Sequence, residues 1–262
     1  MAEPLIFSLV AGIFIGLSAG YVGSLMVLKK MALVGDALSH VALPGLALGI
    51  LFNFNPFIGA FAFLFAASTI TWYIERSTKL SAESIIGVLF VLALAIGILI
   101  TPEPDLLEAL FGNIAKVSFY DALTAVVISI LVLILVRWIY LKTVLSLISE
   151  ELAKSSGINV SRYNFLYLFL VTLVVAIGIK LVGSLLVGAL VIVPAAAAKN
   201  STRNLSSYAK VSGIMGIVSA MSGVMLSYYT GLPAGPLVVV AGTVIFLAAL
   251  FRNRITSSSG NC

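Results

Sequence analysis

Charged residues are scarce in this sequence of 262 residues. Lysine, arginine, aspartate and glutamate together make up 10% of the chain, whereas 61% of it is hydrophobic and the mean hydropathy is +1.19. Soluble domains carry about 25% charged residues, so this chain lacks the polar surface that a water-soluble globule needs. The composition therefore predicts an integral membrane protein with lipid as its main surroundings.

Catalytic side chains are almost as scarce. The single cysteine, Cys262, excludes a disulfide framework. The single histidine, His40, leaves no set of residues for Ser/His/Asp or Cys/His catalysis. No GxxxxGK[ST] phosphate-binding loop occurs in the sequence. We therefore expect a protein that is not an enzyme, has no intrinsic cofactor and does not hydrolyse ATP by itself.

Long apolar runs are abundant by contrast. A helix needs about 20 apolar residues to cross a hydrocarbon core of roughly 30 Å, and the runs lack the alternation of a membrane β-barrel. Nine such runs lie at about 4–28, 33–52, 56–74, 84–101, 121–141, 164–180, 182–198, 207–228 and 235–251. The stretch 164–198 also fits one bent span. We expect an all-α integral membrane protein in which 1–262 form a single polytopic domain of eight to nine transmembrane helices.

The basic residues predict how these helices are oriented, because lysine and arginine stay on the cytoplasmic side. With the N-terminus outside and the C-terminus in the cytoplasm, 13 of the 15 basic residues fall inside, and Lys116 and Lys180 fall outside. The net charge of +5 therefore reflects sidedness and does not indicate a nucleic-acid partner. The inner residues are Lys29, Lys30, Arg76, Lys79, Arg137, Lys142, Lys154, Arg162, Lys199, Arg203, Lys210, Arg252 and Arg254.

One acidic residue lies within an apolar span. Asp36 is in the run VGDALSHVALPGLALG, four residues before His40, so in a helix both side chains lie on one face about one turn apart. A membrane-embedded aspartate costs at least about 2.5–3.5 kcal/mol, which indicates a functional role. A carboxylate and a neutral imidazole form a ligand set that suits Mn, Fe or Zn better than Ca or Mg.

Two structural explanations of the pair remain open from its spacing alone. Asp36 lies a few residues beyond Lys29 and Lys30, in a position to cap its helix. His40 is in a position to form an interhelical hydrogen bond. A metal site also needs more than two ligands, so it requires a second copy of the pair or further residues.

The longest loop on the predicted inner side, at about 142–163, contains LISEELAKSSGINVSRYN. Its apolar Leu147, Ile148 and Leu152 among charged residues predict a short amphipathic helix that ends at Gly157. Such a helix either spaces two spans or provides a docking surface for a cytoplasmic partner.

Four segments together resemble the permease family of ABC importers for manganese, zinc and iron. They are GDALSHVALPGLALG, SEELAKSSGI, VGSLLVGALVIVPAAAAK and GLPAGPLVVVAGTVIFLAAL. The likeness extends from about Lys29 to Arg252. The metal-pathway pair of that family falls on Asp36 and His40, both of which are intact.

The coupling motif of the same family, which docks on an ATPase, falls on Glu151, Ala153 and Gly157, with Leu152 in place of a second small residue. The resemblance implies a multi-pass permease in a prokaryotic cell membrane that imports Mn, Zn or Fe ions. It also implies a homodimer, two cytoplasmic ATPase subunits and an extracellular or periplasmic metal-binding protein. A two-fold axis would bring two copies of the Asp36 and His40 pair to one ion.

Two other functions remain to be distinguished. A proton-coupled secondary metal transporter would use the same pair of residues but has no need of a docking loop. An ABC permease for a metal chelate or vitamin would have a wide pore and would tolerate the change Asp36→Ala.

Overall fold

The computed structural model describes residues 2–100, 110–111, 117–184, 186–202 and 204–258, and within these ranges every regular element is an α-helix. In chain order the helices are α1 (Ala2–Leu28), α2 (Val34–Val41), α3 (Leu43–Leu51), α4 (Pro56–Ser77), α5 (Ala82–Ile100), α7 (Phe119–Ile148), α8 (Glu150–Ser155), α9 (Val160–Val182), α10 (Val187–Ser201), α11 (Leu205–Thr230) and α12 (Ala234–Ser258). The predicted all-α fold is therefore confirmed.

Eight segments of the described chain are long and apolar enough to cross a membrane. α2 and α3 together form one of them, Val34–Leu51. The remaining predicted run, 182–198, corresponds to α10, which has 15 residues and at 1.5 Å per residue is about 22 Å long, shorter than a full span. α9 ends at Gly183, whose φ of 87° lies outside the helical region, so 164–198 forms two helices. The expected count of eight to nine is confirmed.

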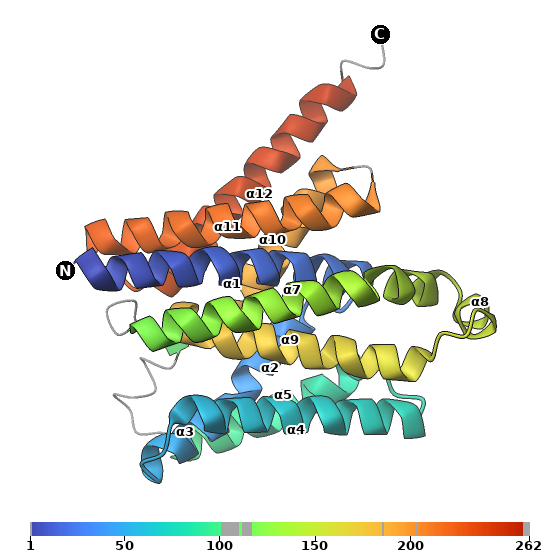
Figure 1. Cartoon of the computed structure of the whole chain (residues 1–262), viewed down its shortest axis with the longest axis horizontal. Helices are drawn as coiled ribbons and strands as arrows, with labels where there is room; N and C mark the ends of the chain where they lie inside the picture. Colours follow the sequence, from blue (N-terminus) through green and yellow to red (C-terminus); the bar gives the residue numbers. More distant parts are fainter. Residues whose placement is uncertain (1, 101–109, 112–116, 185, 203, 259–262) are drawn as a thin grey trace.

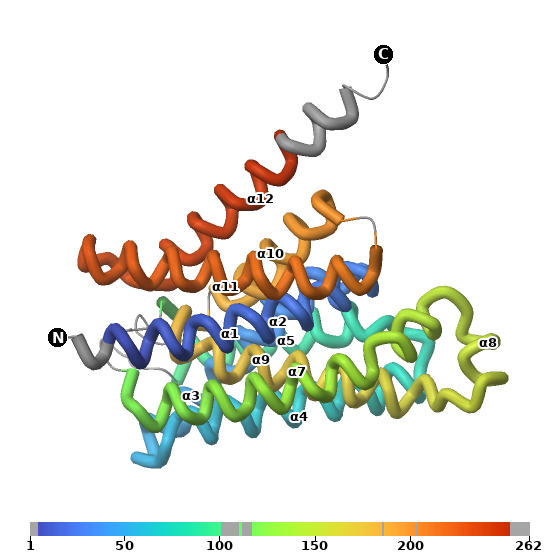
Figure 2. The backbone as a smooth tube through the Cα atoms, turned by 45° about the horizontal axis from the view of Figure 1, so that its top comes forward, coloured from blue at the N-terminus to red at the C-terminus, as the bar shows by residue number. Residues whose placement is uncertain are grey.

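The long helices α1, α4, α7, α9 and α11 lie roughly parallel, and α8 lies beyond one end of this bundle (Figure 1). α1 lies between α7 and α11 and packs against both. The C-terminal part of α12 leaves the bundle at an angle, as Figure 2 shows from a second direction. The chain thus forms a layered bundle around α1, α9 and α10.

Glycines allow α1 and α11 to approach closely. A Cβ on Gly16 would lie 2.4 Å from the carbonyl oxygen of Gly216, and a Cβ on Gly20 would lie 2.2 Å from that of Ser212. The Ser212 hydroxyl donates a hydrogen bond to the carbonyl of Gly20. Small residues at such positions bring helix backbones together where lipid supplies no hydrophobic driving force. α1 is therefore held in place by α11 along much of its length.

The connection from α1 to α2 is a tight turn. Lys30 has a φ of 58°, and its N–H donates to the carbonyl of Val27 at 3.3 Å while the N–H of Met31 donates to that of Met26 at 3.0 Å. These two bonds form a Schellman motif, which usually has glycine at the left-handed position. α2 therefore begins at a fixed place relative to the end of α1.

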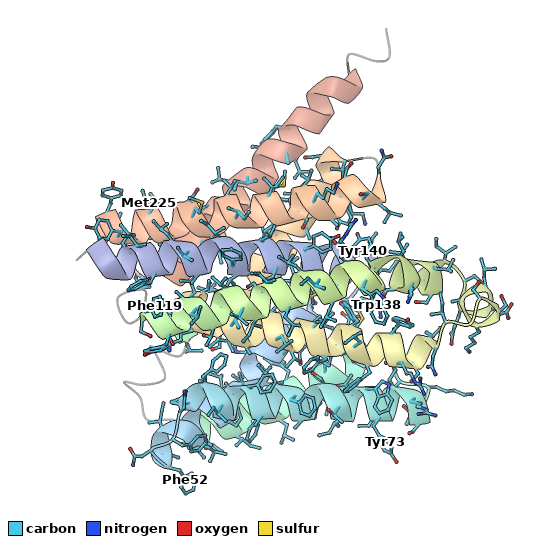
Figure 3. All side chains as sticks on the ribbon, in the orientation of Figure 1. Phe52, Tyr73, Phe119, Trp138, Tyr140 and Met225 are labelled. Atoms are coloured by element: carbon cyan, nitrogen blue, oxygen red, sulfur yellow. The ribbon has the colours of Figure 1, made fainter. Side chains whose placement is uncertain are left out.

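Exposed aromatic residues lie near both ends of the bundle. In Figure 3, Phe52 and Phe119 lie toward one end, and Tyr73 and Trp138 lie toward the end that carries α8. All four side chains are exposed. Tryptophan and tyrosine are enriched where a membrane meets water, so the arrangement fits a bundle that spans a bilayer.

Candidate functional site

The predicted metal pair lies on a helix that is interrupted. Asp36 and His40 both belong to α2, and α3 begins at Leu43, after the single residue Ala42. Pro44 has no backbone N–H, so it cannot donate the helical hydrogen bond to the carbonyl of His40. The N–H of Ala42 donates to that carbonyl instead. Interrupted helices of this kind line the ion sites of many transporters.

Asp36 is not the N-cap residue of α2, although it lies in the first turn, where a carboxylate still favours the helix N-terminus. The N-cap residue of α2 is Leu33, which makes no side-chain capping hydrogen bond. The Nδ1 atom of His40 is buried and has no hydrogen-bond partner among the described residues. The helix therefore does not use Asp36 as its cap, and Nδ1 of His40 does not join two helices.

The surroundings of the pair leave its polar groups available. His40 is 7% exposed, and its ring centroid lies 5.3 Å from that of Phe90 on α5. Asp36 is half-buried and close enough to interact electrostatically with His40. The Ser39 hydroxyl donates to the backbone carbonyl of Asp36 at 2.6 Å, so it does not satisfy the carboxylate. A carboxylate and an unpartnered imidazole nitrogen thus share one short helix.

α10 packs directly against the backbone of Asp36. A Cβ on Gly188 would lie 2.5 Å from the Cα atom of Asp36 and 2.7 Å from its Cβ atom. Such contacts exclude any side chain at this position unless α2 or α10 moves. Gly188 therefore fixes the position of Asp36, although the sequence marked it only as one residue of the segment VGSLLVGALVIV.

One copy of the chain does not provide a complete metal shell. The described residues contain no group of three or more His, Cys, Asp or Glu side chains that could hold a metal ion. Asp36 and His40 supply two ligands, whereas zinc takes about four. The metal role of the pair thus remains a prediction that needs a second copy or other ligands.

The predicted coupling loop contains the short helix α8. Gly157 ends it in the left-handed region, with a φ of 77°. The Gly157 N–H donates to the carbonyl of Lys154 and the Ile158 N–H to that of Ala153, both at 3.0 Å, which is a Schellman motif. The predicted end of this helix at Gly157 is confirmed.

The predicted apolar face of this helix is wrong. Leu147 and Ile148 belong to the last turn of α7, which continues to Ile148 before Ser149 adopts an extended conformation. Leu152 lies in α8 but is exposed, and the residue that α8 buries is Ala153. α8 thus packs Ala153 against the bundle, while its one leucine remains on the surface.

The three predicted coupling residues have different surroundings. Glu151 is exposed, Ala153 is fully buried, and a Cβ on Gly157 would meet nothing within 4 Å. Ala153 thus holds α8 against the bundle, while Glu151 and the turn at Gly157 face outward. Their role in coupling remains a prediction.

Comparison with known proteins identifies the family. The sequence model of the ABC 3 transport family matches residues 1–253. The manganese import system permease protein ScaB of Streptococcus gordonii is 34% identical over 248 residues, which are 93% of this chain and 89% of that protein. The high-affinity zinc uptake system membrane protein ZnuB of Haemophilus influenzae is 31% identical over 259 residues, which are 97% of this chain and 99% of that protein.

A solved structure has the same fold. PsaBC from Streptococcus pneumoniae in complex with Fab contains a chain that is similar with a TM-score of 0.83 and 31% identity, covering 94% of this chain and 91% of that one. The resemblance drawn from the four sequence motifs is therefore confirmed. The chain belongs to the ABC 3 transport family, and its long apolar helices make it a multi-pass membrane permease.

Proposed function

We propose that this chain is the permease of an ABC importer that moves Mn²⁺, Zn²⁺ or Fe²⁺ into a bacterial cell, with Asp36 and His40 on the ion's path. The observation that carries the proposal is the buried Nδ1 atom of His40, which lacks a hydrogen-bond partner among the described residues and lies one turn from the Asp36 carboxylate. A buried polar atom without a partner costs about 1–3 kcal/mol. An ion that binds there would offset that cost.

The ligand chemistry supports a bare metal ion. Carboxylate and imidazole together suit transition metals, and relatives are named for manganese and for zinc. A metal chelate or vitamin would present mostly organic surface and would gain little from this pair. The family match disfavours a secondary transporter, which does not use an ABC ATPase.

The active form is a homodimer in this proposal, because one pair is half of a shell. A two-fold axis close to α2 would place two carboxylates and two imidazoles around one ion, as in an isologous dimer. Two carboxylates would balance the charge of a divalent cation, and neutral imidazoles would complete its shell.

The end of the bundle that carries α8 faces the cytoplasm in this proposal. Lys29 and Lys30 follow α1 at that end, and Arg76 lies in the last turn of α4, as the positive-inside rule requires. Lys180, in the last turn of α9, lies near the opposite end and is paired there with Asp121 of α7. The N-terminus is then outside.

α8 is the contact for a separate ATPase in this proposal. Ile148, the last residue of α7, is 74% exposed, and Leu152 in α8 is 52% exposed. Both lie at an end of the bundle that would face water rather than lipid. Apolar residues exposed to water mark interaction sites when they adjoin one another. An extracellular binding protein would deliver the ion at the opposite end.

Uptake measurements test the metal site. The permease, its ATPase and its binding protein are reconstituted in liposomes, and ATP-dependent uptake of Mn²⁺, Zn²⁺ and Fe²⁺ is measured. We expect Asp36→Asn and His40→Gln each to lower uptake of the transported ion by at least about tenfold, as for lost metal-site interactions. Glu83→Gln removes an exposed carboxylate from the first turn of α5 and serves as the control. Equal uptake by all four proteins would contradict the proposal.

A further inference from the structure

The first turns of α9, directly after the α8 loop, are bound to other helices through side chains. The indole N–H of Trp72 on α4 donates to both the carbonyl and the hydroxyl of Ser161, each at 3.0 Å. The ammonium of Lys142 on α7 donates to the hydroxyl of Tyr163 at 2.8 Å. The start of α9 is therefore joined to both α4 and α7.

A third contact joins α9 to the end of α1. The Lys29 ammonium donates to Oδ1 of Asn164 at 2.9 Å, across 135 residues of sequence, and lies 4.4 Å from the ring centroid of Tyr167. Burial lowers the pKa of Lys29 to about 8, and the nearby carboxylate of Glu75 opposes this effect. Burying a charge raises the free energy of the folded state unless the charge is paired and hydrogen-bonded. The burial of Lys29 therefore carries a free-energy cost that its hydrogen bond to Asn164 offsets only in part.

The turn after Lys29 leads directly to α2. The Met31 N–H donates to the carbonyl of Met26 at 3.0 Å, and the Val34 N–H donates to that of Met31 at 3.1 Å. A Cβ on Gly35 would lie 3.1 Å from the Met26 side chain. These contacts join the residues that follow Lys29 directly to the start of α2.

A cavity separates α8 from α4. It has a volume of about 750 Å³ and is lined in part by α8, which lies beyond one end of the bundle (Figure 1). Its wall includes Glu75 of α4, Lys154 of α8 and Asn164 of α9. α8 is therefore not packed against α4 across this space, which leaves the α8 loop room to move.

We propose that Lys29 is a positioning residue that transmits a displacement of α8 and the start of α9 to α2, and so to Asp36 and His40. This inference rests on the proposed function, in which α8 meets the ATPase. Lys142 makes a comparable contact with Tyr163, but it leads to α7 and not to α2. Lys142 is therefore the matched control.

The test is the number of ions imported per ATP hydrolysed by the full transporter in liposomes, with Mn²⁺, Zn²⁺ and Fe²⁺ each supplied on the binding protein. For Lys29→Met we expect this ratio to fall about tenfold, within the usual range for coupling between two sites, while ATP hydrolysis continues. Lys29→Arg keeps a donor and a charge and should restore most of the ratio. Lys142→Met should change it less than about twofold, since its contact does not reach α2.

Two further variants separate coupling from folding. The double variant Lys29→Met/Glu75→Gln removes both partly buried charges, so it leaves no unpaired carboxylate. Its number of ions imported per ATP should be as low as that of Lys29→Met. Asn164→Leu removes the acceptor, and its effect should not add to that of Lys29→Met because both break one contact. Equal ratios for the wild type and Lys29→Met, or equal losses in Lys29→Met and Lys142→Met, would overturn the inference. Absence of ATP-driven metal uptake by the wild type would instead overturn the proposed function.

Discussion

The two polar regions of this apolar bundle are arranged in opposite ways. On α2, Nδ1 of His40 is buried without a hydrogen-bond partner in the described part of the chain. At the start of α9, the side chains of Ser161, Tyr163 and Asn164 each accept a hydrogen bond from a different segment. A group left unsatisfied is suited to a ligand that comes and goes, whereas the three hydrogen bonds at the start of α9 join it to its neighbours.

The two regions are also positioned by different means. α2 is fixed by backbone contact, since Gly188 of α10 leaves no space for a side chain beside Asp36. The start of α9 is fixed by long polar side chains such as Trp72 and Lys29. The ion site should therefore be most sensitive to added volume, and the junction most sensitive to lost hydrogen bonds.

The largest effect is expected from volume added beside Asp36. Alanine normally stabilises a helix relative to glycine by about 0.8–1.0 kcal/mol, but Gly188→Ala would place its Cβ 2.5 Å from the Cα atom of Asp36. Overpacking of this kind costs about 1–3 kcal/mol. We expect a lower melting temperature and a loss of metal uptake of at least about tenfold.

Gly87→Ala is the control for this change, because a Cβ at Gly87 in α5 meets nothing within 4 Å. It should leave uptake unchanged and keep or raise the melting temperature. If Gly188→Ala transports as well as Gly87→Ala, close packing by α10 does not position Asp36.

The next effect concerns the turn that ends α8. Gly157 has a φ of 77° and open space around it, so Gly157→Val causes backbone strain and no clash. A branched residue in this region costs about 1–3 kcal/mol, which the chain relieves by reorienting α8. ATP-driven uptake should fall severalfold, with the permease still inserted in the membrane.

Gly231→Val is the control, because it causes the same backbone strain at a turn that does not belong to α8. Gly231 ends α11 with a φ of 70° and likewise has open space, near the end of the bundle opposite α8 (Figure 1). Its effect on uptake should be small. Equal losses in the two variants would mean that Gly157 has a structural role only.

The sequence was sufficient for the features that depend on local pattern. Each of the nine apolar runs corresponds to a helix or a helix pair, because hydrophobic length alone decides where a chain crosses lipid. The spacing of Asp36 and His40 placed them on one helix, and Gly157 predicted the end of α8. These features need no information from distant segments.

The sequence was not sufficient for contacts between distant segments. Lys29 appeared only as a basic residue on the predicted inner side, a few positions before Asp36, since its partner Asn164 lies 135 residues away. The approach of Gly188 to Asp36 carries no local pattern either. The apolar side of the predicted short helix was mistaken, since Leu147 and Ile148 belong to α7 and α8 buries Ala153 and leaves Leu152 exposed.

The smallest effect concerns the dependence of stability on pH at the junction. Folding lowers the pKa of Lys29 from 10.5 to about 8. Between these values the unfolded chain holds a proton that the folded chain has released, so unfolding takes up a proton and becomes less favourable as the pH rises. Below about pH 8 both states are protonated and this dependence disappears.

The measurement is the melting temperature of the purified permease at several pH values between about 7.5 and 9.5, the range in which the two states differ in bound protons. From the lower to the higher pH, the wild type should gain about 2–4 °C relative to Lys29→Met, which corresponds to about 1 kcal/mol for a chain of this size. Lys142→Met retains Lys29 and should follow the wild type. Parallel curves for the wild type and Lys29→Met would mean that Lys29 titrates as an ordinary surface lysine.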